Sequence, residues 1–137
     1  GLKSEQAKAS ATQAGSIRDV NVVGGEMNCV NCAVATDATL AGRPSSALGG
    51  GPFRIDTLEK IYGNKFGNPG PSSKVADEVL AAGAGARGIV FGSRGNGEVG
   101  HVFNVINQNG TVRFLDGQTG RPASLEGYQS FQLLRTN

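Results

Sequence analysis

The dipeptide Asn109-Gly110, set between two runs of alternating apolar residues, limits the possible folds of this chain more than any other feature. Asn-Gly is the strongest short-range signal of a β-hairpin, because both residues accept the positive φ that a tight turn requires. The flanking runs, His101 to Ile106 and Thr111 to Asp116, are therefore expected to be paired antiparallel strands. Further strands are expected at Gly88 to Phe91 and at Phe131 to Leu134.

Helical patterns occupy the first half of the chain. Asn28 is a good N-cap for a helix from Cys29 to Leu40. A second helix is expected from the capping-box pattern of Asp56 and Glu59, and a third is expected to begin at Ser73. Glycines are expected to end these helices at Gly42, Gly63 and Gly83. Helices first and strands afterwards predict an α+β fold, with N-terminal helices packed on an antiparallel β-sheet.

At 137 residues the chain is long enough for one domain with a core of its own. Its formal net charge is only +2 and it has no long basic run, so nucleic acid is not an expected partner. No apolar run approaches the length of a membrane span and no signal-peptide pattern opens the chain, so no membrane partner is expected. The first residue is Gly1, which fits either a cloning remnant or a domain cut from a larger protein. We expect residues 1–27 to be a lead-in segment and residues 28–137 to form the single domain.

The only histidine, His101, begins the first hairpin strand, and Asp116 ends the second. With a four-residue loop, His101 would lie directly across from Asp116. With a two-residue turn, it would face Gln118, and Asp116 would be its diagonal neighbour on the same apolar face. Only a three-residue loop would put the two side chains on opposite faces. The pattern therefore predicts an Asp–His pair, either structural or part of an active site.

Both cysteines of the chain, Cys29 and Cys32, stand at the start of the first expected helix. A thiol there has its pKa lowered by the helix dipole and by a nearby imidazolium, and free backbone N–H groups can bind an oxyanion. We expect the hairpin to carry His101 and Asp116 under this helix, which gives a nucleophile with a base and an orienting carboxylate. Three alternatives remain open: a redox Cys-x-x-Cys pair, a zinc site through both cysteines and His101, and two buried small apolar side chains.

The order of cysteine at a helix start, histidine on a strand and aspartate on the next strand matches papain-like enzymes. The chain also resembles the papain-fold toxin domains found at the C-terminal ends of bacterial polymorphic toxins. The resemblance spans about Asn28 to Gly120. It rests on four sequence segments, which are Asn28-Cys29-Val30-Asn31-Cys32-Ala33-Val34-Ala35, Ala38-Thr39-Leu40-Ala41-Gly42, Gly100-His101-Val102-Phe103-Asn104-Val105 and Phe114-Leu115-Asp116-Gly117-Gln118. It implies that residues 28–137 are a papain-like catalytic domain.

The resemblance further implies a cysteine hydrolase, either a protein-glutamine deamidase or a sequence-specific protease. The expected catalytic residues are Cys29 as nucleophile, His101 as base and Asp116 as its orienting group. Cys32 is the alternative nucleophile or redox partner, and Asn28 and Gln118 are candidates for supporting the oxyanion or the site. A binding module that uses the same cleft without chemistry is the non-enzymatic alternative.

The expected partners also follow from the resemblance. They are a target protein as substrate and a cognate immunity protein that blocks the site. The domain is expected to be the C-terminal domain of a larger secreted toxin, to be delivered into another cell and to act in its cytoplasm. We expect it to need no cofactor and no metal.

Overall fold

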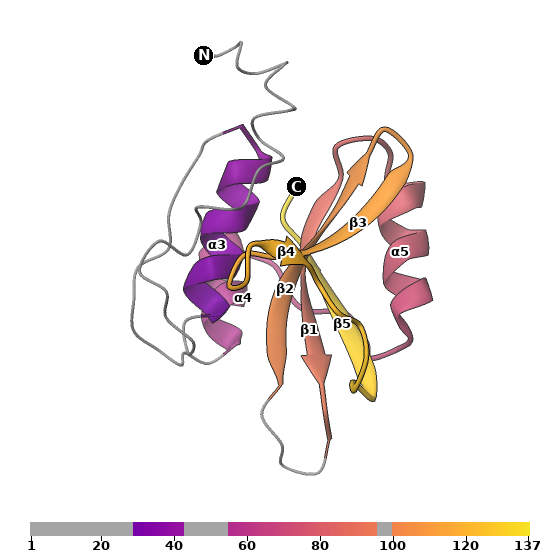
Figure 1. The fold of residues 1–137 in the computed structure, drawn as a ribbon. Coiled ribbons are helices and arrows are strands. Elements are labelled where there is room, and N and C mark those ends of the chain that lie inside the picture. The colour runs from indigo at the N-terminus through magenta and orange to yellow at the C-terminus, as the bar shows by residue number, and fades with distance from the viewer. Residues whose placement is uncertain (1–28, 43–54, 96–99) are drawn as a thin grey trace.

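The computed structural model describes residues 29–42, 55–95 and 100–137, and these residues form three helices and five strands (Figure 1). The helices are α3 (Cys29–Leu40), α4 (Asp56–Tyr62) and α5 (Ser72–Ala81). The strands are β1 (Arg87–Ser93), β2 (His101–Gln108), β3 (Thr111–Asp116), β4 (Arg121–Pro122) and β5 (Ser130–Arg135). The short strand β4 was not predicted, and the predicted lead-in segment lies outside the described residues.

The strands form one sheet in the order β4-β3-β2-β1-β5, and each strand is antiparallel to its neighbours. The predicted α+β architecture, helices packed on an antiparallel sheet, is therefore confirmed. Strand β2 lies in the middle of the sheet, where both of its edges are hydrogen-bonded. In the strand registers, Asn104 to Ile106 pair with a strand on each side, whereas His101 to Phe103, at the start of β2, pair with β1 alone.

A two-residue turn, Asn109-Gly110, closes the hairpin between β2 and β3. Gln108 pairs with Thr111, and the two turn residues have positive φ values, 55° at Asn109 and 94° at Gly110. The side chain of Asn107 supports the turn, since its Oδ1 accepts a hydrogen bond of 2.7 Å from the Gly110 N–H. A β-branched residue at Gly110 would not tolerate this φ, which is why the Asn-Gly pair determines the register.

Helices cover both faces of the sheet. Helices α3 and α4 lie over one face, and α5 lies over the other (Figure 1). On the α3 side, the helix meets alternate residues of β2, among them Val102 and Ile106. On the α5 side, Val75 and Val79 of the helix meet Phe103 and Val105 of the same strand. The two faces of β2 thus pack against different helices.

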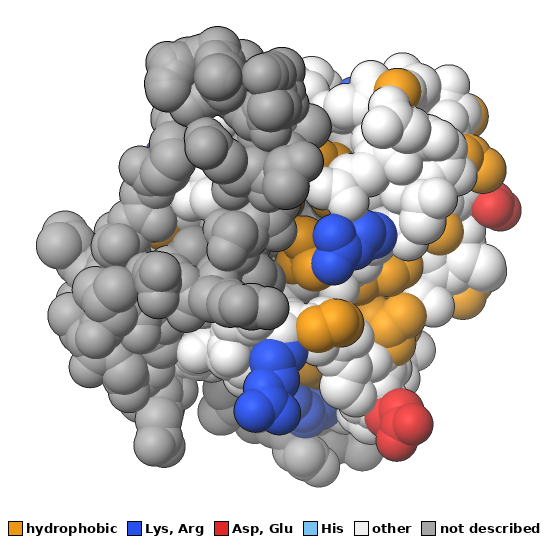
Figure 2. Space-filling view, turned by 45° about the horizontal axis from the view of Figure 1, so that its top comes forward, with side chains coloured by type: hydrophobic (Ala, Val, Ile, Leu, Met, Phe, Trp, Pro, Cys, Tyr) orange, Lys and Arg blue, Asp and Glu red, His pale blue; other side chains and the backbone are white. Residues whose placement is uncertain are grey.

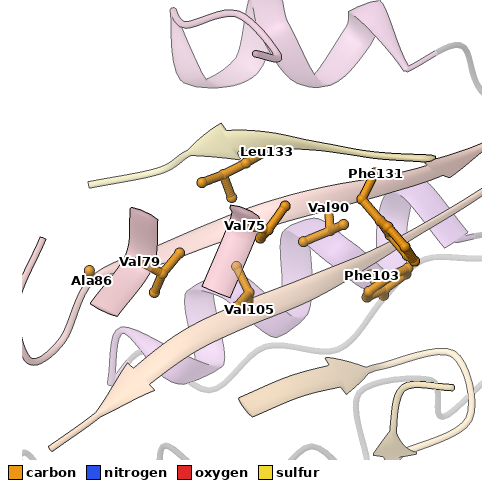
Figure 3. Close-up of a cluster of buried hydrophobic side chains, with 8 residues drawn as sticks. All are labelled: Val75, Val79, Ala86, Val90, Phe103, Val105, Phe131 and Leu133. Atoms are coloured by element: carbon orange, nitrogen blue, oxygen red, sulfur yellow. The ribbon is translucent and has the colours of Figure 1, made fainter. Parts of the chain in front are cut away.

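The core under α5 is a single cluster of aliphatic and aromatic side chains (Figure 3). Phe103 is its most central aromatic residue, with ring contacts to Phe114, Tyr128 and Phe131. Burial of such side chains contributes roughly 1.5–3 kcal/mol each. The cluster therefore holds β1, β2 and β5 to α5 and gives the start of β2 a rigid support.

Two predictions about the helix starts were wrong in detail. Helix α4 begins with Ile55 at its N-cap and Asp56 already inside the helix, so the predicted capping box does not form. The Glu59 carboxylate instead accepts a hydrogen bond of 2.8 Å from the backbone N–H of Phe66, in the loop that follows. Helix α5 begins at Ser72, one residue before the predicted start, after Pro71 at its N-cap. The predicted glycine stops are confirmed, because Gly42, Gly63 and Gly83 all have positive φ.

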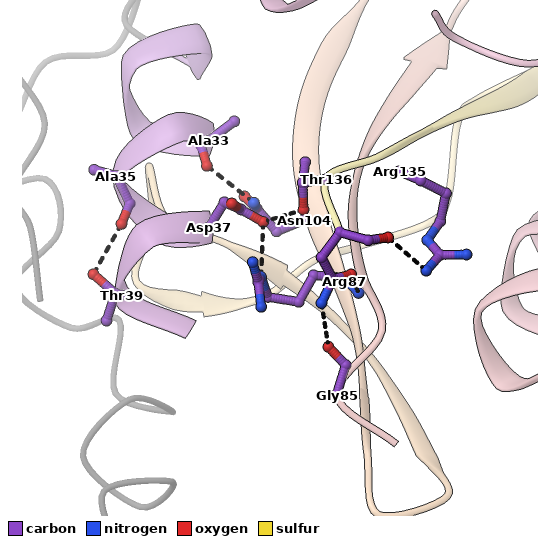
Figure 4. A network of polar contacts seen from close by, with 10 residues as sticks. Ala33, Ala35, Asp37, Thr39, Gly85, Arg87, Asn104, Arg135 and Thr136 are labelled. Carbon is purple, nitrogen blue, oxygen red and sulfur yellow. Dashed lines mark hydrogen bonds and ion pairs between the residues drawn. The ribbon is translucent and has the colours of Figure 1, made fainter. Parts of the chain in front are cut away.

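The last turns of α3 are tied to the sheet by a buried ion pair (Figure 4). Nε of Arg87, at the start of β1, lies 3.2 Å from Oδ1 of Asp37. The hydroxyl of Thr136, after β5, donates to the same oxygen at 2.6 Å. These contacts join the helix to β1 and to the C-terminal residues that follow β5.

Hydrophobic side chains reach the surface between Lys and Arg side chains on the face shown in Figure 2. Among the described residues, the large hydrophobic side chains most exposed are Ile61 on α4 and Leu80 on α5. Such mixed surfaces are ordinary for folded proteins. Within the described ranges, no helix combines the length and apolar character needed to cross a membrane.

Candidate active site

His101 and Asp116 meet at one end of the sheet. The two-residue turn makes Asp116 the diagonal neighbour of His101 on the same face, as predicted for that register. His101 Nε2 lies 2.8 Å from Asp116 Oδ2, and both side chains are mostly buried. A hydrogen bond to Nε2 leaves Nδ1 as the ring nitrogen available to a third group.

The carboxylate of Asp116 is held from behind by the turn after β3. The backbone N–H of Gln118 donates to its Oδ1 at 3.0 Å, while Oδ2 is directed to His101. The Asp116 carbonyl accepts bonds from the Gly120 N–H at 2.8 Å and from the Thr119 hydroxyl at 3.2 Å. Gln118 therefore contributes its backbone to the site, and these contacts fix the direction of the carboxylate.

Cys29, the first residue of α3, lies against the start of β2. Its side chain is hydrogen-bonded to His101, and the backbone N–H of Val102 also donates to its sulfur. Cys29, His101 and Asp116 thus form a continuous chain of hydrogen bonds across a helix and two strands. The structure brings together the three side chains predicted from the sequence, and Asn28 lies outside the described residues.

The way these residues meet differs from the prediction in one respect. The face of β2 that carries Phe103 and Val105 is covered by α5 and not by the helix of Cys29. Helix α3 packs on the opposite face. His101 still reaches Cys29 because it is the first residue of β2, at the end of the strand and beside the first turn of α3.

The contacts among these groups shift the pKa values of both the imidazole and the thiol. Burial alone would lower the pKa of His101, but its hydrogen bonds to Asp116 and Cys29 and their charges raise it from 6.5 to about 9. Burial alone would raise the pKa of the Cys29 thiol. The bonds from His101 and Val102 and the imidazolium charge outweigh that effect and bring the pKa below its ordinary value of 9.0. The lowered thiol pKa and the raised imidazole pKa both favour a thiolate paired with an imidazolium.

Cys32 has a different environment one turn further along α3. Its side chain is only 2% exposed and packs with Ala35, Leu40, Ile106 and Leu115. Burial, with smaller effects of the Asp116 and Cys29 charges, raises the pKa of its thiol to about 12. Cys32 is thus a protonated core side chain, and both cysteines are free thiols.

A group of aromatic side chains, which was not predicted from the sequence, lies beside His101. The His101 ring stacks on Phe103 at 6.1 Å, and Phe103 contacts Tyr128, which follows β4. Tyr128 lies over Gly92, the cross-strand partner of His101, where a Cβ atom would come within 2.7 Å of the Tyr128 ring. The guanidinium of Arg94 lies 4.8 Å from the centre of the same ring and 3.3 Å from its hydroxyl. No local motif predicts these contacts, because Tyr128 comes from a loop distant in sequence.

No group of three or more His, Cys, Asp or Glu side chains within the described ranges is placed to hold a metal ion. The arrangement of Cys29, His101 and Asp116 is instead a hydrogen-bonded series in which each group contacts the next. Such a series can activate a nucleophile and pass a proton to a leaving group.

Comparisons with known proteins agree on the fold. A family model described as papain fold toxin 1, glutamine deamidase, matches residues 27–121, which is well over half of the chain. Two solved structures of the Salmonella effector SpvD, its G161 and R161 variants, match with a TM-score of 0.62 and 16% sequence identity. Each match covers 95% of this chain and 78% of the SpvD chain. No curated protein sequence gave a significant match. The predicted papain-like fold is confirmed.

Proposed function

Because the chain belongs to the family of papain-fold toxins described as glutamine deamidases, we propose that it deamidates a glutamine side chain of a target protein. Family membership makes it a papain-fold hydrolase of the toxin class. The observation that carries the finer proposal is the series Cys29–His101–Asp116, with 2.8 Å between His101 Nε2 and Asp116 Oδ2. In this proposal the three residues form a catalytic triad.

The proposed reaction is acyl transfer through a thioester. The Cys29 thiolate adds to the carbonyl carbon of the glutamine amide, and the C=O electron pair moves to oxygen. The His101 imidazolium gives its proton to the amide nitrogen, the C–N bond breaks and ammonia leaves. Water then attacks the thioester and gives a proton to His101. The C–S bond breaks, which releases glutamate and restores the thiolate and the imidazolium.

Two further groups support this reaction. Asp116 holds the imidazole in one orientation and stabilises its charged form. The first N–H groups of a helix have no partner within the helix, so those at the start of α3 are the expected donors to the oxyanion that forms next to Cys29. A donor aimed at the developing charge stabilises the transition state more than the ground state.

Cys29 is the proposed nucleophile in preference to Cys32. Its thiol contacts His101 and has a lowered pKa, whereas the Cys32 thiol is buried in the core and has a pKa of about 12. Cys32 also lies one turn further along α3, where backbone N–H groups are used within the helix. A Cys29–Cys32 disulfide that must form for turnover would instead favour the redox alternative.

Proteolysis is the second candidate reaction, because a peptide amide can be cleaved by the same steps with an amine as leaving group. The deciding experiment compares intact and peptide masses of proteins from a target-cell lysate treated with wild type or with Cys29→Ala. Deamidation predicts a gain of about one dalton at a glutamine, with the chain uncut, since an amide becomes an acid. New protein termini that appear only with wild type would make the protein a sequence-specific protease. If neither the mass gain nor new termini are found, a binding module without chemistry would be favoured.

The partners and the place of action are part of the same proposal. The family description as a toxin supports a domain that is delivered as an effector and acts on a protein in the cytoplasm of the target cell. A toxin of this kind requires protection of the producing cell, so we propose a cognate immunity protein that blocks the Cys29 site. Co-expression with candidate immunity proteins, followed by assay of the purified pair, tests this partner.

A further inference from the structure

The contact between α3 and β2 determines where Cys29 stands relative to His101, since the two residues belong to separate elements. The buried side of α3 is made mostly of small side chains, including Ala33, Ala35 and Thr36. Small side chains let the helix approach the sheet closely. Apolar contact has no preferred direction, however, so it does not by itself determine the position of the helix along its axis.

Asn104 adds a directional contact at this interface. Its side chain is 0% exposed, and its Nδ2 donates to the backbone carbonyl of Ala33 at 3.0 Å (Figure 4). Asn104 lies three residues after His101 on β2, and Ala33 lies four residues after Cys29, about one helical turn. This bond therefore joins the first turns of the nucleophile helix to the strand that begins with the imidazole.

The stability of the fold does not explain an asparagine at this position. Within the described part of the chain, Asn104 Oδ1 is a buried oxygen with no hydrogen-bond partner, and so is Thr36 Oγ1. An unpaired buried amide oxygen lowers stability. The neighbours on the same face of β2, Val102 and Ile106, are aliphatic, and an aliphatic residue between them would avoid this unfavourable term.

We propose that Asn104 is a positioning residue that anchors Ala33 and so holds the Cys29 thiol in register with His101 and the Val102 N–H. Hydrogen bonds weaken steeply with misalignment, so a small slide or rotation of α3 would separate the thiol from both partners. The proposal deepens the proposed function, because it rests on the Cys29–His101 pair as the reacting groups.

The test is Asn104→Leu, read first by the pH dependence of Cys29 alkylation with iodoacetamide. The thiol pKa is expected to rise toward its ordinary value of 9.0, because the imidazolium and the Val102 N–H no longer reach the sulfur. Peptide mass spectrometry assigns the alkylated cysteine. In the deamidation assay, kcat/KM is expected to fall about 10- to 100-fold, the scale of a misplaced reacting group. The midpoint of urea unfolding is expected to stay the same or to rise.

Asn107→Leu is the matched control. Asn107 is also buried on β2, but its Nδ2 is directed to the carbonyls of Val79 and Leu80 on α5, each at 3.4 Å, and its Oδ1 supports the hairpin turn. This variant is expected to lower the urea midpoint and to leave the alkylation profile unchanged. The two variants thus separate an effect on the site from an effect on the fold.

Asn104→Ala is the second variant, because it needs no more space than asparagine and it also removes the bond to Ala33. If wild type shows a lowered thiol pKa and both Asn104 variants keep it, the positioning role is wrong while the proposed function stands. If the wild-type thiol itself titrates at its ordinary value, the Cys29–His101 pair and the proposed function fail together with the positioning role. Alkylation needs no protein substrate, so these outcomes are distinct even before a target is known.

Discussion

At the scale of single residues, the chemistry of the site depends on whether Cys29 or His101 holds the proton that the two side chains share. The contacts with Asp116 and Cys29 raise the pKa of His101 to about 9, and the same pair lowers the pKa of the Cys29 thiol. Both shifts favour the state in which the proton lies on the imidazole and the thiol is ionised. The leaving nitrogen can then receive a proton without a prior transfer from sulfur.

This charge state predicts the pH dependence of catalysis. As pH rises, kcat/KM should first increase as Cys29 loses its proton, at a pH below 9.0, and should then decrease near pH 9 as His101 loses its own. The loss at high pH follows because neutral imidazole cannot protonate the leaving group. A kcat/KM profile from pH 5 to 10 measures both limbs. An activity that already falls near pH 6.5, the ordinary value for histidine, would contradict the effect of Asp116.

The identity of the nucleophile gives a second prediction. Cys29→Ala and His101→Ala are each expected to lower kcat by at least about 1000-fold, because the triad acts as a unit. Asp116→Asn should be milder than either, since part of the orientation of the imidazole survives. Initial rates of ammonia release measure these effects, and circular dichroism checks that the variants fold. Full activity of Cys29→Ala, with an inactive Cys32→Ala, would reverse the assignment.

At the scale of elements, α3 carries Cys29, the proposed nucleophile, and is held to the sheet by polar contacts at two levels. Near its start, Ala33 is bound by Asn104 of β2. About one turn further, Asp37 is bound by Arg87 of β1 and by Thr136. The aliphatic contacts of α3 stabilise its packing on the sheet, and these polar contacts determine the position of the helix along its axis.

The Asp37–Arg87 pair gives the third prediction. Arg87→Met leaves the Asp37 carboxylate buried without its cation, so the free energy of unfolding should fall by about 3 kcal/mol. Urea unfolding followed by circular dichroism measures this loss. The double change Asp37→Asn with Arg87→Met should recover much of it, because no buried charge remains.

Arg113→Met provides the control for this experiment. Arg113 is an exposed residue of β3, and within the described ranges its side chain bonds to another surface group, Gln108, at 3.0 Å. Its replacement is expected to change the free energy of unfolding by less than about 0.5 kcal/mol. An equal loss for Arg87→Met and Arg113→Met would mean that the buried pair contributes nothing special to the attachment of α3.

At the scale of the whole molecule, the site lies where both layers of helices meet the end of one strand. Helix α3 supplies Cys29 from one face of the sheet, and the α5-side core supports Phe103, on which the His101 ring stacks. The start of β2 therefore contacts Cys29, the proposed nucleophile, on one side of the sheet and is supported by the packed core on the other. Changes in either layer can reach the site through this strand.

The fourth prediction concerns metal in the whole protein. The proposed acyl transfer uses only groups of the protein and water, so purified protein is expected to hold no stoichiometric zinc and to keep its deamidation rate in the presence of a chelator. Elemental analysis and assays with and without the chelator measure this. One zinc per chain, together with loss of activity on its removal, would contradict the triad and support the zinc alternative.

Local patterns in the sequence determined most of the elements. The N-cap pattern at Asn28 and the stop at Gly42 predicted α3 with its observed bounds. Asn109-Gly110 predicted the hairpin but left its register open between a four-residue loop and the two-residue turn that the structure shows. Alternation along the strands put His101 and Asp116 on one face. These features depend on backbone sterics and on spacing within a few residues, so they can be recognised without knowledge of the fold.

Tertiary structure alone decided which helix covers which face of β2 and how Cys29 reaches His101 from the opposite layer. It also made the two thiols different, because the core around Cys32 and the charged groups around Cys29 come from distant segments. The polar Asn104 stood out on an otherwise aliphatic face of its strand, yet its partner could not be named from the sequence. Burial, hydrogen-bond partners and pKa shifts arise from contacts between residues far apart in the chain, and no local pattern encodes those contacts.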